Sequence, residues 1–452
     1  MPHVLFVDAN EGAFLTIDRA VERGYSVTLI ESSTGLLYDP CDPYIASVRS
    51  RISTILRAQT TTASTLLVAA VKNVHAASPV DALIAPLEDS VESAAVAAAA
   101  VGIRFTDPNA VALARRKDQA RAALTRVGLP SAQYALCHRV EEAVAAARRI
   151  GLPVIVKPAS GTDSLYARTA TSLSAVIRAA EQALGAHQEV GAALAEQFAR
   201  GVVVEELLVG DLVSVEIAAS GGELMPFLVN GRSQAQSDPC IEMGAVTPAP
   251  LPEPLMHACC DYAVAACRAV GLDLGVFHVE LVLTADGPRL VEINPRLMGG
   301  VMPRMFERVT GIPAGDIVLD VHLGLLTRPP ELRTSGFCTG RKILPVLDST
   351  IPPGATSRIK QMLSTYPNVE FRNYSLRDGG PVRASHAIGR VLAHDEEYGS
   401  VTRTADDVVW EFERVLGVDL EKALTDTHAG REVESHGTER TWLSRRRHPT
   451  PG

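Results

Sequence analysis

Residues 277–296 read FHVELVLTADGPRLVEINPR, two apolar strand-like runs joined by an Asp-Gly turn, with acidic side chains at fixed places. Side chains alternate between the two faces of a strand, so Glu292 and Asn294 are expected on one face. Arg296 follows just beyond the break that Pro295 makes in the strand. The pattern predicts an antiparallel hairpin whose flanks are too apolar for a solvated ribbon.

The length of the hairpin loop decides which side chains face each other. If residues 285–287 form a three-residue loop, Glu280 lies directly opposite Glu292. A two-residue turn at 286–287 would instead set Glu280 against Ile293 and turn the two acids to opposite faces. A surface hairpin with scattered charges is the remaining alternative.

The predicted pairing of two carboxylates suggests a cation site. Like charges that face each other across a strand pair are destabilising, so a cation is expected between Glu280 and Glu292. The side chains on offer, including Asn294, present only oxygen ligands. This set favours a hard ion, Mg²⁺ with Mn²⁺ as the alternative, over zinc or iron.

The composition is that of an ordinary globular protein. The chain has 452 residues, of which 46% are hydrophobic and 21% charged, enough for two or three domains. A net charge of −9 argues against a nucleic-acid partner. The seven cysteines form no CxxC pair, and no apolar run is long enough to span a membrane. We expect a cytoplasmic protein that acts on small molecules.

The arrangement of apolar runs predicts a multidomain protein of α/β and α+β class. The first hundred residues alternate strands with Ala-rich helices, which indicates a parallel sheet. Glu88 follows one of these strands, where loops of parallel sheets bind ligands. Helices are expected at 16–23, 91–101, 110–127 and 405–416. The expected divisions are an N-terminal α/β domain at 1–106, an α+β domain at 107–328, a C-terminal α+β, β-rich subdomain at 329–424 and a disordered polar tail at 425–452.

Lys157 ends an apolar strand and is followed by the small residues Ser160, Gly161 and Ser164. A lysine held by a strand is a positioned charge, and a Gly/Ser loop can place backbone N–H groups on phosphate oxygens. The order differs from a Walker A sequence because the lysine precedes the loop. The alternative is an ordinary strand-to-turn junction.

A second β-branched strand, residues 202–208, ends in two acids, Glu205 and Glu206. Exposed backbone up to Leu208 is suited to hydrogen-bond a purine edge, and an acid there is suited to accept the purine amino group. Together with the preceding lysine loop, this strand predicts a nucleotide site.

The order of these motifs resembles the ATP-grasp carboxylate–amine ligases over most of residues 1–425. The resemblance adds Lys117, at a predicted helix start, to the motifs VKP, VEELLVGD and EINPR. It implies an ATP-grasp fold in the central domain, preceded by a pre-ATP-grasp domain. It also implies these roles: Lys117 and Lys157 on the ATP phosphates, Glu205 and the backbone through Leu208 on adenine, Glu280, Glu292 and Asn294 on two Mg²⁺ ions, and Arg296 on an acyl phosphate.

Within that family, the stretches GVFHVE (275–280) and IEMGAVTPAPL (241–251) resemble the L-amino-acid ligases that make dipeptides. This resemblance makes Glu242 a candidate for binding an ammonium group, His278 a candidate for the active-site wall and Glu88 a substrate-contacting acid. The alternatives are a solvated loop acid at Glu242 and a packed core histidine at His278.

The chain departs from the family pattern at the ribose position, where Leu212 replaces a glutamate. Asp211 and Glu216 are the candidate substitutes, so the ribose contact stays unassigned. The phosphate loop contains a single glycine, Gly161, whereas the loops of many relatives contain more. The family resemblance also makes a homodimer plausible.

The predicted function is an ADP-forming ligase. It would use ATP to turn a carboxylate, expected to be an amino acid, into an acyl phosphate and then join it to an amine. One alternative is a biotin-carboxylase-like or purine-pathway ATP-grasp enzyme that activates bicarbonate or formate. Another, from a different class, is a non-catalytic ATP-binding regulatory module.

Overall fold

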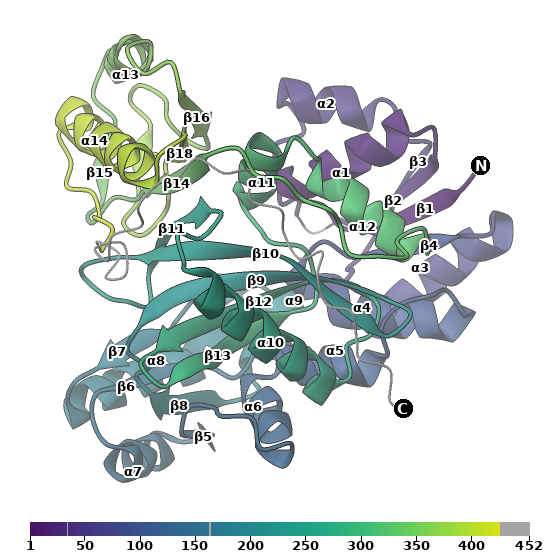
Figure 1. Ribbon diagram of the computed structural model, residues 1–452, viewed down its shortest axis with the longest axis horizontal. Coiled ribbons are helices and arrows are strands. Elements are labelled where there is room, and N and C mark those ends of the chain that lie inside the picture. Colours follow the sequence, from purple (N-terminus) through teal and green to yellow (C-terminus); the bar gives the residue numbers. More distant parts are fainter. Residues whose placement is uncertain (34, 162–163, 425–452) are drawn as a thin grey trace.

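The computed structural model describes residues 1–33, 35–161 and 164–424, and the predicted polar tail lies outside them. The chain begins with a parallel four-stranded sheet in the order β3-β2-β1-β4, shown in purple and blue in Figure 1. Its elements are β1 (His3–Val7), α1 (Glu11–Glu22), β2 (Ser26–Ser32), α2 (Pro43–Arg49), β3 (Thr54–Ala58), α3 (Ser64–Ala77), β4 (Ala82–Ile84) and α4 (Glu88–Val101). This confirms the predicted βαβ pattern.

Two helices start earlier than the sequence pattern predicts. Helix α1 begins at Glu11, because the side chain of Asn10 caps it by accepting the backbone N–H of Ala13 at 3.0 Å. Helix α4 begins at Glu88, so this acid occupies a helix start. The acidic first turn suits the positive end of the helix dipole.

The single helix predicted at 110–127 is wrong: the structure has two helices, α5 (Pro108–Arg115) and α6 (Lys117–Arg126). The chain is extended at Arg116, with φ −98° and ψ 106°. The break frees the backbone N–H of Lys117, which donates to the carbonyl of Ala159 at 2.9 Å. Helix propensity is therefore overridden by a contact with the Gly/Ser loop.

An antiparallel sheet follows in the order β5-β8-β6-β7, with helices packed against it. Its elements are β5 (Tyr134–Cys137), α7 (Val140–Ile150), β6 (Val154–Pro158), β7 (Arg168–Ala170), α8 (Leu173–Glu189), α9 (Ala192–Phe198) and β8 (Val202–Glu206). Val154, Val156, Val202 and Val204 bury their side chains against Ala-rich faces of α7 and α8. The opposite face of the same strands carries Lys157 and Glu205.

The largest sheet has eight antiparallel strands in the order β13-β12-β9-β10-β11-β14-β18-β16. Its strands are β9 (Asp211–Ser220), β10 (Glu223–Gln234), β11 (Glu242–Thr247), β12 (Gly275–Thr284), β13 (Gly287–Asn294), β14 (Phe337–Ile343), β16 (Val369–Asn373) and β18 (Gly389–Asp395). The sheet crosses the expected boundary at residue 328. At this crossing the backbones of β11 and β14 lie close together at Gly244, which has φ +157°. A Cβ atom at this position would lie 2.0 Å from the carbonyl oxygen of Gly340.

Helices and a small two-stranded sheet, β15-β17, complete the C-terminal half. They are α10 (Glu253–Val270), α11 (Met302–Thr310), α12 (Ala314–His322), β15 (Ser349–Thr350), α13 (Ala355–Leu363), β17 (Pro381–Val382) and α14 (Tyr398–Leu416). Figure 1 shows α13 and α14 beside β14, β16 and β18 at the upper left. The predicted fold class, a parallel N-terminal sheet followed by antiparallel sheets, is confirmed.

The hairpin of residues 277–296 has the predicted acid pair but a different loop. Glu280 does pair with Glu292, yet the turn holds two residues, 285–286, because Thr284 pairs with Gly287. Leu281 pairs with Leu290, so Val291 is an extra residue in β13. This β-bulge restores the register that a three-residue loop was predicted to set.

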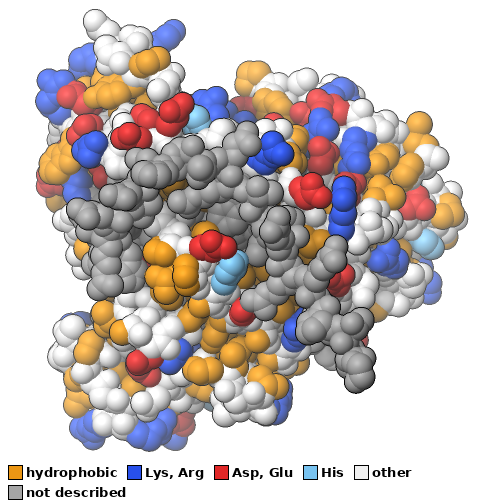
Figure 2. All heavy atoms as spheres, viewed as in Figure 1, with side chains coloured by type: hydrophobic (Ala, Val, Ile, Leu, Met, Phe, Trp, Pro, Cys, Tyr) orange, Lys and Arg blue, Asp and Glu red, His pale blue; other side chains and the backbone are white. Residues whose placement is uncertain are grey.

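The described surface mixes charges of both signs. Figure 2 shows Lys, Arg, Asp and Glu side chains interspersed over the face in view, with no broad field of one sign among them. Within the described ranges, none of the helices combines the length and the apolar character that a membrane crossing needs.

Candidate functional site

The predicted site residues meet in one cavity of about 380 Å³ that is lined from both antiparallel sheets. The predicted residues on its wall are Glu88, Lys117, Lys157, Gly161, Ser164, Glu205, Glu206, Leu208, Glu242, His278, Glu280, Glu292, Asn294 and Arg296. Ser160 is not on the wall: it is fully buried, and its hydroxyl donates to the carbonyl of Arg115 at 3.2 Å. We call this space the charged cavity.

Lys157 and Glu205 form a buried ion pair on neighbouring strands. Lys157 pairs in register with Val203, which places Glu205 diagonally opposite it on the same face. The carboxylate of Glu205 also contacts Arg121, at 2.7 Å. Burial lowers the pKa of Lys157, and the Glu205 carboxylate opposes that shift. The two carboxylate oxygens of Glu205 thus each contact a cation, so the predicted hydrogen bond from a purine amino group to Glu205 would have to compete with Lys157 and Arg121.

Arg121 explains why the β-bulge is stable. This arginine is fully buried, one helical turn after Lys117 on α6. Its Nη2 donates to the carbonyls of Val291 at 3.1 Å and Leu290 at 3.4 Å, in the irregular part of β13. The carbonyls that the bulge removes from the strand ladder therefore find a donor.

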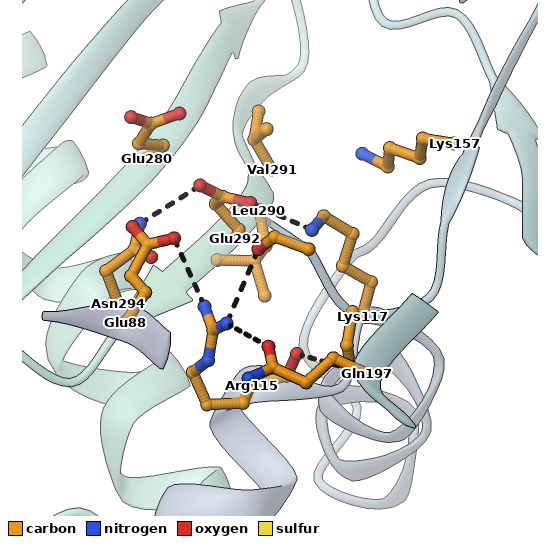
Figure 3. A network of polar contacts seen from close by, with 12 residues as sticks. Glu88, Arg115, Lys117, Lys157, Gln197, Glu280, Leu290, Val291, Glu292 and Asn294 are labelled. Atoms are coloured by element: carbon orange, nitrogen blue, oxygen red, sulfur yellow. Dashed lines mark hydrogen bonds and ion pairs between the residues drawn. The ribbon is translucent and has the colours of Figure 1, made fainter. Parts of the chain in front are cut away.

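Glu292 and Asn294, two of the three predicted metal ligands, lie beside Lys117. Asn294 donates to Glu292 at 3.0 Å, and Lys117 Nζ lies 3.1 Å from the other oxygen of Glu292, as Figure 3 shows. Burial alone would raise the pKa of Glu292, but Lys117 and Asn294 hold it well below its usual range. Glu280 lies opposite on β12.

This face fits a hard divalent cation by its donor set, which consists of carboxylate and amide oxygens. Among the described residues, however, no three His, Cys, Asp or Glu side chains cluster as metal ligands do. The facing acids also have cations of the protein's own, Lys117 on Glu292 and Arg232 on Glu280. Charge repulsion between Glu280 and Glu292 is therefore relieved without a metal ion. The remaining argument for a metal ion at this face is its set of oxygen donors.

His278 belongs to a buried ionic network at the side of the cavity. Its Nδ1 lies 2.6 Å from Glu216, its direct cross-strand partner, and its Nε2 lies 3.1 Å from Glu280. Burial alone would lower the pKa of His278, but the carboxylates of Glu216 and Glu280 raise it to about 9. Glu216 is fully buried in this pairing and does not line the charged cavity, which argues against it as the ribose acid.

Glu242 reaches the same network from β11. Its carboxylate lies 2.8 Å from Arg232 and 4.0 Å from Arg390. Burial would raise the pKa of Glu242, but Arg232 and the basic groups of Lys342 and Arg390 hold it well below its usual range. Glu242 is therefore not a solvated loop acid, and an ammonium ligand would have to compete with Arg232.

Glu88, at the start of α4, contacts arginines from two other parts of the chain. Its carboxylate forms ion pairs with Arg296 and, at 3.4 Å, with Arg115. Arg115 also donates to Gln197 at 3.1 Å, as Figure 3 shows, and to the carbonyl of Gly161 at 3.4 Å. Burial lowers the pKa of Arg296 to about 10, which still leaves it charged at neutral pH.

Sequence reasoning missed four arginines of this site. Arg115, Arg121 and Arg232 are buried, and Arg390 lines the cavity. Two had a signal: Arg121 follows Lys117 by four residues and so shares its helix face, and Arg232 interrupts an apolar strand. Arg115 and Arg390 had none, because their partners lie far away in the chain.

A comparison with protein-family models finds a match in the central part of the chain. A family model described as the ATP-grasp domain matches residues 150–304. The predicted resemblance to ATP-grasp proteins is confirmed for residues 150–304, the part of the chain that the model matches.

Particular relatives are similar over parts of their length. Carnosine synthase 1 of Gallus gallus is 34% identical over 135 residues, which is 30% of this chain and 14% of that protein. Phosphoribosylamine–glycine ligase of Streptococcus pyogenes serotype M1 is 31% identical over 266 residues, which is 55% of this chain and 58% of that protein. The chain thus matches less than two thirds of each.

A solved structure is similar over nearly the whole chain. The L-amino acid ligase from Bacillus licheniformis has a TM-score of 0.73 and 17% sequence identity. The match covers 93% of this chain and 99% of that one. At this identity the likeness shows the fold.

Proposed function

We propose that this protein is an ADP-forming carboxylate–amine ligase. The observation that carries the proposal is the convergence of two lysines, an oxygen-rich face and Arg296 on the charged cavity. These groups come from both antiparallel sheets and from the start of α6. A module that only binds ATP has no need for an arginine beside the oxygen-rich face.

The proposed reaction requires that a carboxylate be converted to an acyl phosphate, because oxide is a poor leaving group. Phosphoryl transfer of this kind depends on positioning and on neutralising the triphosphate charge. Lys117 and Lys157 supply positive charge to the phosphates. Glu280, Glu292 and Asn294 would hold Mg²⁺, and the bound ion would supply further charge neutralisation.

Arg296 has the geometry for the second half of the reaction. Its planar guanidinium is suited to bind an acyl phosphate and the oxyanion formed when an amine attacks. In the described structure Glu88 holds it through an ion pair. A substrate carboxylate or phosphoryl group would replace Glu88 as the partner of Arg296.

We propose amino acids as both substrates, with a dipeptide as the product. The names of the similar proteins support this choice: one is an L-amino acid ligase, and another joins glycine to an amine. A cytoplasmic location is also proposed, supported by seven cysteines that are all free thiols. The homodimer stays a prediction.

A phosphate-release assay tests the proposal. The protein, ATP and Mg²⁺ are combined with single amino acids, with pairs, with bicarbonate and with formate, and products are analysed by mass spectrometry. We expect phosphate release that depends on an amino acid, with an amide product when an amine is present. Release with bicarbonate or formate alone would favour the alternative enzymes, and ATP binding without release would favour a regulatory module.

A further inference from the structure

A second cavity of about 430 Å³ adjoins the charged cavity on the side of the N-terminal domain. The wall of this cavity is mostly apolar and is formed by elements that are far apart in the chain. Examples are Ala13 on α1, Leu87 before α4, Phe277 on β12 and Val318 on α12. We call it the apolar cavity.

The two cavities meet at an ion pair. Glu88, Arg296, Gly299 and Gly300 line both of them, and Glu88 is paired with Arg296. A zwitterion matches this junction, because its carboxylate can replace Glu88 on Arg296 while its ammonium group takes the place of Arg296 on Glu88. Such a molecule would direct its side chain into one of the two cavities.

His322, at the end of α12, is a polar residue on the apolar wall. It is 6% exposed, its ring lies 5.7 Å from that of Phe105, and its Nδ1 has no hydrogen-bond partner in the described structure. Burial, with the nearby charge of Arg104, lowers the pKa of its imidazole to about 4, so the ring is neutral at pH 7. A buried polar atom without a partner is costly unless a ligand supplies one.

We propose that the apolar cavity binds the side chain of the amino acid that is activated, and that this side chain is aromatic with a hydroxyl group that hydrogen-bonds His322. The inference rests on the proposed function, since it names the substrate class of that site. A phenolic hydroxyl both donates and accepts, so it satisfies the neutral imidazole in either tautomer.

The size of the cavity supports a large side chain. Ligand pockets of about 300–1,000 Å³ enclose drug-sized molecules, and this cavity falls within that range. Glycine or alanine would leave most of it unfilled, and the apolar wall would offer few partners to the water that remained. An aromatic ring would contact Phe105, Phe277 and Val318 instead.

Ligand binding without ATP tests this inference apart from catalysis. Thermal unfolding of the full chain is measured with tyrosine, phenylalanine or alanine, and no nucleotide. We expect tyrosine to raise Tm most, phenylalanine less and alanine least. An equal shift for alanine and tyrosine, or no shift with any of the three, would overturn the inference.

Steady-state kinetics test the role of His322. In the wild type, kcat/KM for tyrosine should exceed that for phenylalanine by about tenfold, the worth of one hydrogen bond with its desolvation. His322→Leu should bring the ratio close to one, and His322→Gln should restore part of it. His257→Leu, at a partly exposed histidine on α10, is the matched control and should keep the wild-type ratio.

A cavity-filling variant tests the apolar cavity without changing His322. Val318→Phe should raise the KM for tyrosine by about tenfold or more, because the added ring occupies the cavity. The KM for alanine should stay unchanged. An unchanged tyrosine preference in both His322→Leu and Val318→Phe would overturn the inference. Phosphate release that responds to alanine as strongly as to tyrosine would overturn it while leaving the ligase proposal intact, and release with no amino acid dependence would overturn the ligase proposal itself.

Discussion

The charged cavity and the apolar cavity share four wall residues but have opposite chemistry. In the charged cavity Glu205, Glu280 and Glu292 each contact a cation of the protein. In the apolar cavity His322 stands beside aromatic and aliphatic side chains with an unpartnered Nδ1. If the proposed function is correct, reaction chemistry and side-chain selection occupy separate spaces that meet at Arg296 and Glu88.

The strongest test of this separation is Glu292→Gln. It removes a carboxylate from the oxygen-rich face and leaves Lys117 without its partner, so phosphate release should fall below detection. Tyrosine should still raise Tm, because the apolar cavity is untouched. Glu223→Gln, at an exposed position on β10, is the control. Wild-type turnover in Glu292→Gln would contradict the assignment of the site.

The charged cavity should also depend on Arg121 for its shape. Arg121→Met leaves Glu205 with one cation fewer and the carbonyl of Val291 without its donor. Removal of one partner from a buried ionic network lowers the free energy of unfolding by about 3–5 kcal/mol. Urea denaturation measures this loss. Arg126→Met, at an exposed position at the end of the same helix, should leave stability unchanged. Equal stability of the two variants would refute the role given to Arg121.

Arg296→Lys tests the junction of the two cavities. Lysine keeps the charge but loses the planar fork, so kcat should fall by about 10²–10³-fold. The tyrosine-induced Tm shift should change far less, since the apolar wall remains. Arg328→Lys, at a surface position 78% exposed, controls for the substitution. A fall of less than tenfold would exclude Arg296 from the transition state.

The smallest expected effect concerns the apolar cavity alone. His322 has its pKa lowered from 6.5 to about 4 by burial and by Arg104, so the unfolded chain binds more protons between these values. Stability should therefore fall as pH decreases from 6.5 towards 4, by at most about 1.4 kcal/mol per pH unit. His322→Gln should show a shallower dependence in urea denaturation across that range. Parallel curves would mean that His322 is not buried as a neutral base.

Local patterns in the chain were sufficient for much of the charged cavity. Strand alternation placed Glu292 and Asn294 on one face, and the structure joins them by a hydrogen bond. The strand that carries Lys157 close to its end was also predicted correctly. Each of these features depends on neighbours a few residues away in the sequence.

The loop of the hairpin shows where local rules fail. Glu280 opposes Glu292 as predicted, but the cause is the bulge at Val291 rather than a three-residue turn. That bulge is stabilised by Arg121, some 170 residues away along the chain. The orientation of Ser160 was missed for the same kind of reason, because it depends on Arg115 across the fold.

The sequence by itself determined the type of most elements and the faces of the strands, whereas the set of residues proposed to bind ATP came from the family resemblance. The elements and the faces follow from backbone periodicity and from the chemistry of each side chain. Only the tertiary structure decided which charges are paired, that Glu88 holds Arg296, and that an apolar cavity lies beside them. Those features require elements from distant parts of the chain to pack together, and no local pattern encodes the distance between them.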